Sequence, residues 1–185
     1  AIKNIELLSE VVNEDMPLLG IEPSAILGFR DEYPELVKGE LLEKARKLAD
    51  NTFLADEFIA SEFNAGRISA DRFTDQESEM LLHGHCQQKA IASTLSTRKL
   101  LSIPEHYEVS EIPSGCCGMA GSFGYEKEHF ELSMKVGELV LFPAVREAEK
   151  GTIISAPGTS CRHQIKDGTG EKAEHPVQIL YNALI

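Results

Sequence analysis

The sequence lacks the features that mark membrane-spanning and nucleic-acid-binding proteins. No apolar run approaches the roughly 18–20 residues that a membrane-spanning helix needs, and no basic and apolar leader opens the chain. Its 18 basic residues form no cluster and are outnumbered by 30 acidic ones, for a formal net charge of −12. Because clustered cations hold phosphate groups, we expect no nucleic-acid partner. We expect a cytoplasmic protein that is peripheral to a membrane only through a parent complex.

Common catalytic and nucleotide-binding patterns are missing as well. The chain has no P-loop, no Ser-His-Asp arrangement with supporting motifs and no pair of catalytic carboxylates. Gly118, Gly121 and Gly124 follow a G-x-x-G-x-x-G spacing, whereas dinucleotide sites use G-x-G-x-x-G with an acidic residue further on. The sequence therefore predicts no flavin or nucleotide site of its own.

The composition predicts one compact α/β domain. A chain of 185 residues can bury a hydrophobic core, and 42% apolar with 26% charged residues argues against disorder. The apolar residues recur with helical and strand periods in turn, which predicts a small, mostly parallel sheet flanked by helices. The first residue is Ala, and an amphipathic helix already starts at residue 2, so we expect a piece of a larger chain.

The periodic segments predict the following elements. We expect helices over 2–13, 39–49, 52–65, 86–101, 126–141, 144–149 and 175–183, and strands over 18–21, 80–82, 107–112 and 152–155. The cysteines occupy three positions along the chain, and each position lies just past the carboxyl end of a predicted strand. Open α/β sheets bind their ligands at that edge.

The chain has four cysteines, Cys86, Cys116, Cys117 and Cys161. A disulfide framework fits poorly, because two of them are adjacent and no secretory leader is present. Inert core cysteines also fit poorly, because the adjacent pair lies in a glycine-rich loop. Four thiolates from three loops favour a soft metal site.

The residues around the cysteines suit an anionic cofactor. Cys86 follows His83-Gly84-His85 at a strand-to-helix junction, where free N–H groups and the helix dipole stabilise a thiolate. Gly118 and Gly121 let the backbone approach a bulky group and direct N–H groups at it.

Two other chemistries remain open on the residues alone. Zinc accepts four thiolates, or three thiolates and an imidazole from His83 or His85, although the usual C-x2–4-C knuckle is absent. We expect these histidines to hydrogen-bond around the site rather than to ligate. Thiol–disulfide exchange at Cys116 and Cys117 is the third reading, without a Cys-x-x-Cys motif to support it. Arg162 and His163, next to Cys161, are expected to offset thiolate charge.

A family resemblance narrows these alternatives. Cys116-Cys117-Gly118 resembles the CCG motif of the cysteine-rich domain of iron–sulfur oxidoreductases. This family includes the heterodisulfide reductase B subunit and the iron–sulfur subunits of glycolate oxidase and anaerobic glycerol-3-phosphate dehydrogenase. The strings HGHCQQKA (83–90) and SGCCGMAGSFGY (114–125) are similar to a narrower group, in which the domain follows an FAD-binding oxidase, as in D-lactate and D-2-hydroxyglutarate dehydrogenases. The resemblance runs from about residue 18 to the end.

The resemblance implies a ligand set. The family motif is a lone cysteine, then Cys-Cys-Gly, then Cys-x-x-Cys, and by position Cys86, Cys116, Cys117 and Cys161 match it. Gly158 stands in place of the penultimate cysteine. The departure leaves four ligands, which favours an ordinary 4Fe-4S cluster over the non-cubane clusters of the five-cysteine motif.

A second departure concerns the beginning of the chain. Relatives often have cysteine after Glu-Pro-Ser, where this chain has Ala25. The resemblance therefore implies that residues 1–38 are the remnant of a preceding CCG repeat and that residues 39–185 are the complete cysteine-rich domain, within one compact unit.

The resemblance also implies a function. FAD in another part of the parent chain would oxidise a 2-hydroxy acid, and the cluster would pass the electrons to a quinone or a carrier protein. The expected partners are the FAD-binding domain or subunit and that acceptor. The chain alone is not expected to turn over substrate.

Overall fold

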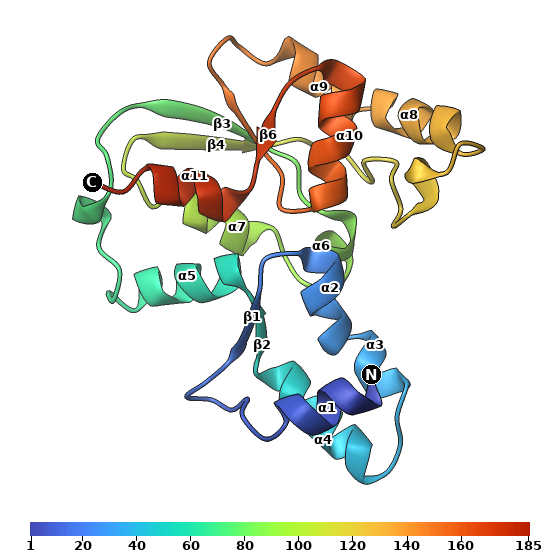
Figure 1. The fold of residues 1–185 in the computed structure, drawn as a ribbon. Helices are drawn as coiled ribbons and strands as arrows, with labels where there is room; N and C mark the ends of the chain where they lie inside the picture. The colour runs from blue at the N-terminus through green and yellow to red at the C-terminus, as the bar shows by residue number, and fades with distance from the viewer.

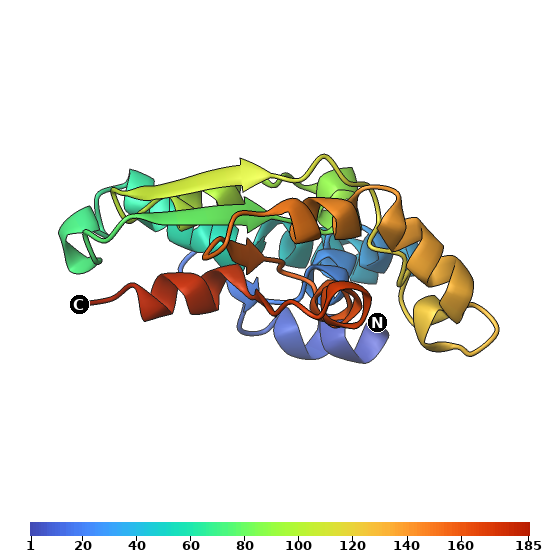
Figure 2. The same ribbon diagram turned by 90° about the horizontal axis from the view of Figure 1, so that it is seen from above.

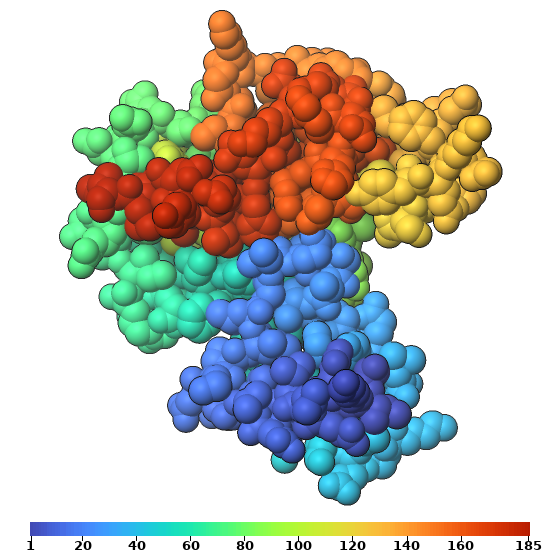
Figure 3. Space-filling view, viewed as in Figure 1, coloured from blue at the N-terminus to red at the C-terminus, as the bar shows by residue number.

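The computed structural model describes residues 1–185 and consists of two lobes (Figures 1 and 3). The N-terminal lobe, residues 1–54, contains a two-stranded sheet, and the C-terminal lobe, residues 55–185, contains a four-stranded sheet. All strand pairs in both sheets are parallel. The predicted α/β class is confirmed.

The helices and strands alternate along the chain. In order they are α1 (Ile2–Leu8), β1 (Leu18–Gly20), α2 (Pro23–Ile26), α3 (Glu32–Glu35), α4 (Glu40–Asp50), β2 (Thr52–Leu54), α5 (Ala55–Asn64), β3 (Ser78–Leu82), α6 (Cys86–Ile91), α7 (Leu95–Leu101), β4 (Tyr107–Glu111), α8 (Phe130–Glu138), α9 (Leu141–Glu147), β5 (Ile153–Ser155), α10 (Thr159–Thr169), β6 (Ala173–Glu174) and α11 (Pro176–Asn182). Short 3-10 turns lie at Leu27–Phe29, Ala70–Arg72 and Phe123–Tyr125.

The larger sheet is covered on both faces. One core cluster joins its strands to α7 and α11 through residues such as Met80, Leu100 and Ile179, and the other joins them to α9 and α10 through Phe142 and Ile165. Alternate residues of each strand therefore face opposite helical layers. The resulting helix–sheet–helix arrangement can be followed in Figures 1 and 2.

The strand order creates a crevice at one edge of this sheet. The order is β4-β3-β5-β6, so the chain moves from β3 to β4 and then crosses back to the other side of β3. Ligands bind in parallel sheets where the order reverses, at the carboxyl ends of the strands. Here that position lies between β3 and β5, and the strands β3 and β4 point the same way beside it (Figure 2).

The N-terminal lobe rests on the edge where these strands end. Glu22, at the start of α2, accepts a hydrogen bond from the backbone N–H of Thr159 at 2.8 Å, and His175 Nε2 lies 2.8 Å from the carbonyl of Ile21. Within the lobe, α1 and α3 pack on α4. Elements on both sides of residue 38 thus share one lobe, and the division at that residue stays a prediction.

Several predicted helix boundaries are wrong. The helix expected over 52–65 begins at Ala55, because Thr52–Leu54 pairs with β1 as a strand. The helix expected over 86–101 is interrupted at Ala92, which adopts φ −137° and ψ −140°. The helix expected over 2–13 ends at Leu8, and the one over 126–141 begins at Phe130.

Helix α3 was missed, as were two elements of the C-terminal lobe. The sequence of α10, TSCRHQIKDGT, is mostly polar, and only Cys161, Gln164 and Ile165 are buried, so no apolar stripe predicts it. The strand β6 is only two residues long and pairs at the sheet edge.

Candidate metal centre

Three loops at the carboxyl edge of the sheet bring the cysteines together. Cys86 is the first residue of α6, just after β3, and Cys161 lies in the first turn of α10, just after β5. Cys116 and Cys117 follow β4. The predicted location at strand carboxyl ends is therefore confirmed, and β3 and β5 flank the crevice described above.

The four thiols form one chain of contacts. Cys86 contacts Cys116, Cys116 contacts Cys117, and Cys117 contacts Cys161. All four are free thiols; Cys117 and Cys161 are buried, Cys116 is half-buried and Cys86 is exposed. The site is thus closed on the α10 side and open on the α6 side.

The contacts make alternate sulfurs acidic. Hydrogen bonds from the thiols of Cys117 and Cys86 hold the pKa of Cys116 far below its usual range, and the bond from Cys117 lowers the pKa of Cys161 to about 5 despite burial. The same contacts, together with burial, raise the pKa of Cys86 and of Cys117. A bound cation would release the protons that these two retain.

Backbone N–H groups surround the adjacent pair. Gly118 N–H donates to Cys116 Sγ at 3.3 Å, and the N–H of Ala120 also lowers the pKa of this thiol. Gly118, Ala120 and Gly121 have φ values of 104°, 41° and 70°. Successive turns of this kind form an anion-binding nest of N–H groups. A Cβ on Gly118 would overlap the carbonyl oxygen of Ser133, so only glycine fits there.

A cavity of about 180 Å³ opens beside three of the four cysteines. It is lined by Ser24, His85, Cys86, Gln87, Cys116, Cys117, Ala120, Gly121 and Ser160. A water molecule occupies about 30 Å³ in the liquid. The cavity therefore has room for a group of several atoms, and Gly121, without a side chain, helps to leave that room.

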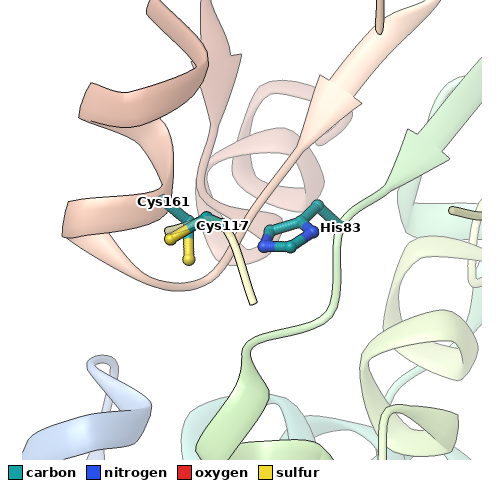
Figure 4. Close-up of side chains that lie close together, drawn as sticks. All are labelled: His83, Cys117 and Cys161. Atoms are coloured by element: carbon teal, nitrogen blue, oxygen red, sulfur yellow. The ribbon is translucent and has the colours of Figure 1, made fainter. Parts of the chain in front are cut away.

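His83 faces the buried end of the site. Its side chain has no exposed surface, and Nδ1 lies 2.7 Å from the hydroxyl of Ser114. Nε2 is buried, and a hydrogen bond between this ring and Cys161 contributes to the lowered pKa of that thiol. The donor atoms of His83, Cys117 and Cys161 lie within 4.8 Å of one another, and Figure 4 shows the imidazole edge turned toward the two sulfurs.

His85 has a different environment. Its Nδ1 accepts a hydrogen bond from the N–H of Gln87 at 3.3 Å, which caps the N-terminus of α6. The ring lies against Gly158, where an added Cβ would overlap His85 Cδ2 and lie 3.1 Å from Cys161 Sγ. The imidazole thus fills the space that any side chain at position 158 would need.

Neighbouring polar residues complete the site, and sequence reasoning missed most of them. Lys89 donates to the carbonyl of Ser114 at 2.6 Å, which ties α6 to the loop of the adjacent cysteines. Ser24 lines the cavity, and Glu22 binds the first N–H of α10. In the sequence the Glu-Pro-Ser string was notable only for the cysteine that relatives often have after it, and nothing predicted that residues 22–24 lie at this site.

Arg162 and His163 do not take the role expected of them. Arg162 donates to the carbonyls of Ala156 and Pro157 and so fixes the loop before α10. His163 lies 2.8 Å from the hydroxyl of Tyr125. Their side chains are held by these partners rather than by the sulfurs.

Proteins similar in sequence to this chain are dehydrogenases or their subunits. The chain is 28% identical over all 185 residues to an anaerobic glycerol-3-phosphate dehydrogenase subunit of Escherichia coli (strain K12), of which it covers 45%. The D-2-hydroxyglutarate dehydrogenases of Escherichia coli (strain K12) and Pantoea ananatis (strain AJ13355) are 29% and 28% identical over 97% of the chain, which covers 17% of each. The chain is homologous to dehydrogenases.

The chain spans less than half the length of these relatives. No protein-family profile matches it, and no solved structure is significantly similar. None of its helices has both the length and the apolar character that crossing a bilayer requires. Any function more specific than homology to dehydrogenases therefore depends on the residues around the sulfurs.

Proposed function

We propose that this chain holds an iron–sulfur cluster and relays electrons within a dehydrogenase. Cys86, Cys116, Cys117 and Cys161 are the proposed ligands, and 4Fe-4S is the proposed cluster. The observation that carries the proposal is the cavity of about 180 Å³ beside three of these cysteines. A single metal ion needs no such space, whereas a cluster of several iron and sulfide atoms does.

The donor groups suit the charge of such a cluster. Four thiolates are soft ligands for iron. The N–H groups of Gly118 and Ala120 donate to Cys116, and that of Met119 donates to Cys117. N–H donors to cluster sulfurs stabilise the reduced, more negative state and so set the reduction potential.

A bound cluster would supply one-electron chemistry. The chain would shield one side of the cluster from solvent and leave the other side accessible to electron donors and acceptors. Cys117 and Cys161 are buried, while Cys86 is exposed. Electrons would therefore enter or leave most readily on the Cys86 side. We infer that an FAD-binding region delivers them after oxidising a 2-hydroxy acid, and that a quinone or a carrier protein receives them.

The names of some relatives support that substrate class, since D-2-hydroxyglutarate is a 2-hydroxy acid, whereas glycerol 3-phosphate shares with it only a secondary alcohol. The relatives are a glycerol-3-phosphate dehydrogenase subunit and D-2-hydroxyglutarate dehydrogenases. Both named substrates carry a secondary alcohol, whose oxidation releases two electrons. A one-electron relay allows such a pair to leave a flavin in two steps.

An anaerobic redox titration tests the relay. We expect the iron- and sulfide-reconstituted protein to gain an electron paramagnetic resonance signal on one-electron reduction and to lose it reversibly on oxidation. The Cys161→Ser and Cys117→Ser variants should lose the signal or change its shape, because each removes a proposed ligand. A wild-type protein that binds iron and sulfide but accepts no electron would contradict the proposed relay.

Zinc is a second candidate, favoured by one observation. The donor atoms of His83, Cys117 and Cys161 lie within 4.8 Å of one another. Zinc bonds of about 2.0–2.3 Å in a tetrahedron put the ligand atoms roughly 3.4–3.8 Å apart, so these three fit one ion after a small contraction. Stoichiometric zinc without acid-labile sulfide in the protein as isolated would favour a structural site.

A further inference from the structure

We propose that His83 and Ser114 form a hydrogen-bonded relay that raises the reduction potential of the cluster without binding metal. The hydroxyl of Ser114 donates to His83 Nδ1, and His83 Nε2–H donates to the sulfur of Cys161. The inference deepens the proposed function and rests on it, because a reduction potential requires a cluster. The two hydrogen bonds can also be measured in the metal-free chain.

The first step is that the ring of His83 is fixed between two strand ends. Its backbone N–H donates to the carbonyl of Ser155 at 2.8 Å, which continues the pairing of β3 with β5. Nδ1 lies 2.7 Å from the hydroxyl of Ser114, and the ring makes a second hydrogen bond, to Cys161. Figure 4 shows the imidazole edge turned toward the sulfurs of Cys117 and Cys161. The ring therefore connects the loop after β4 to the first turn of α10.

The second step places the protons. A thiolate that binds metal carries no proton, so the sulfur of Cys161 can only accept, and the ring proton must lie on the nitrogen that faces it. The direction of the pKa shift agrees: a donor to a thiolate lowers its pKa, and the contact with His83 lowers that of Cys161. A neutral imidazole has one proton, so Nδ1 holds a lone pair. The hydroxyl of Ser114, which can rotate, then donates to Nδ1.

The third step concerns solvent. The side chains of His83, Ser114 and Cys161 are all buried, so water cannot replace any member of the relay. A hydrogen bond in such a medium is electrostatically stronger than in water. A donor to a ligand sulfur stabilises the reduced, more negative state of a cluster and so raises its potential. Cys86, by contrast, is exposed, and solvent can hydrogen-bond to its sulfur.

The fourth step is that Ser114 is itself held in place. Its carbonyl accepts a hydrogen bond from Lys89 Nζ at 2.6 Å, and Lys89 also lies 3.9 Å from a carboxylate oxygen of Glu111. Ser114 precedes Cys116 by two residues, so the same contacts position the loop of the adjacent cysteines. Without the hydroxyl, Nδ1 of His83 would lose its donor, and the ring would be less firmly oriented toward Cys161.

His85 is not part of the relay. Its Nδ1 accepts from the N–H of Gln87 at 3.3 Å, which caps α6, and its ring lies against Gly158. A substitution of His85 would therefore disturb a helix start as well as the cavity. Substitutions of His83 and Ser114 report on the relay more directly.

Anaerobic redox titrations of the reconstituted full chain test the relay through the midpoint potential. His83→Leu removes both ring nitrogens, and we expect its potential to be more negative than that of wild type. His83→Gln, whose amide N–H can take the place of Nε2–H, should restore most of the difference. Ser114→Ala should shift the potential in the same direction as His83→Leu, but less. His106→Leu, in an exposed loop before β4, is the matched control and should leave the potential unchanged.

Iron content and urea unfolding of the same samples separate the relay from a merely structural role. A loss of iron or of stability in His83→Leu, with an unchanged potential in the cluster that remains, would overturn the inference. Equal shifts in His83→Leu and His83→Gln would overturn it as well, because only the second keeps a donor. Should His83→Leu not fold, Ser114→Ala decides, and a wild-type potential in that variant would overturn the relay.

Chains labelled with ¹⁵N-histidine distinguish failure of this inference from failure of the proposed function. In nuclear magnetic resonance spectra of the metal-free chain, we expect His83 to carry its proton on Nε2, and a proton on Nδ1 instead would overturn the relay. In the reduced cluster, His83 should show a weak nitrogen coupling, and a strong one, typical of a directly bound nitrogen, would overturn it.

A reducible cluster whose potential the variants do not change overturns the inference and leaves the proposed function intact. If the wild-type chain binds no iron and sulfide, the proposed function fails and the effect on potential fails with it. The position of the His83 proton in the metal-free chain still decides whether the two hydrogen bonds exist.

Discussion

At the scale of single residues, Gly158 determines how His85 reaches the sulfurs. The family resemblance puts a cysteine at this position, and the structure puts the imidazole of His85 in the space that a side chain here would fill. The imidazole of His85, packed against Gly158, therefore occupies the space that a cysteine side chain at position 158 would occupy. This exchange explains why the chain can lack a fifth cysteine without a hole beside Cys161.

A substitution at Gly158 tests this packing. We expect Gly158→Ala to destabilise the metal-free protein by about 1–3 kcal/mol, because its Cβ would overlap His85. Gly115→Ala is the matched control in the cysteine loop, since nothing lies within 4 Å of its added Cβ, and it should cost less than about 0.5 kcal/mol. Urea unfolding measures both. Equal free energies of unfolding in the two variants would show that the ring of His85 moves aside without a loss of stability.

The cysteine positions could be predicted from the sequence, but the roles of the histidines could not. A break after each apolar run identifies a strand end, and parallel strands end at one edge, so Cys86, Cys117 and Cys161 had to approach each other. The difference between His83 and His85 depends on Ser114 and Gln87. Those contacts arise from packing and capping, which no local pattern records.

At the scale of elements, α10 depends on a residue from the other lobe. Glu22 accepts the hydrogen bond of the Thr159 N–H, which would otherwise lack a partner at the helix start. Burial alone would raise the pKa of Glu22, but the hydrogen bonds from Thr159 and Ser24 outweigh it and lower this pKa. A carboxylate at the N-terminus of a helix is also favoured by the helix dipole.

Glu22→Gln should weaken this helix in a pH-dependent way. We expect a loss of about 0.5–1 kcal/mol near pH 7, at the low end for a helix cap because the carboxylate is partly exposed. Since the folded pKa is lowered, the contribution is present above the unfolded pKa of about 4.3 and disappears as pH falls through the folded value. Urea unfolding at several pH values measures it, with Glu10→Gln, an exposed residue, as control. A difference between Glu22→Gln and wild type that persists below both pKa values would argue against this cap.

Helix α10 also shows the limit of pattern-based prediction. Its first turn holds Cys161, yet most of its residues are polar, and its N-terminus is completed from 137 positions away by Glu22. The same holds for β2, whose three residues are a strand only because β1 pairs with them. Long-range partners, rather than local propensity, decide such segments.

At the scale of the whole molecule, a buried polar cluster joins the start of α5 to α6 and α7. Asp56, two residues after β2 of the N-terminal lobe, accepts hydrogen bonds from Thr97 and, at 3.3 Å, from Gln88. Gln88 also donates to Thr97 at 2.8 Å. Because Gln88 is on the helix that begins at Cys86, this cluster links the connection between the lobes to the cysteine site.

The ionisation of Asp56 should make the stability of the whole protein depend on pH. Burial raises the pKa of Asp56 more than its hydrogen bonds lower it. The folded state therefore holds this proton more tightly than the unfolded state, so stability is highest below the unfolded pKa of about 3.9 and falls as pH rises through the folded pKa. Asp56→Asn should remove that fall, whereas Asp75→Asn, an exposed control, should retain it. Chemical unfolding at a series of pH values checks this, and a fall of the same size in Asp56→Asn would rule out Asp56 as its source.

The central claim is that the loops after β3, β4 and β5 form one cluster site, and its most direct test is the iron and acid-labile sulfide content of the anaerobically reconstituted protein. We predict about four iron and four sulfide atoms per chain, as in a cluster held by four cysteines. The content should fall sharply in Cys117→Ser and Cys161→Ser and stay unchanged in Gly115→Ala. Zinc in stoichiometric amount with no sulfide, or iron content that the cysteine variants do not alter, would contradict the account.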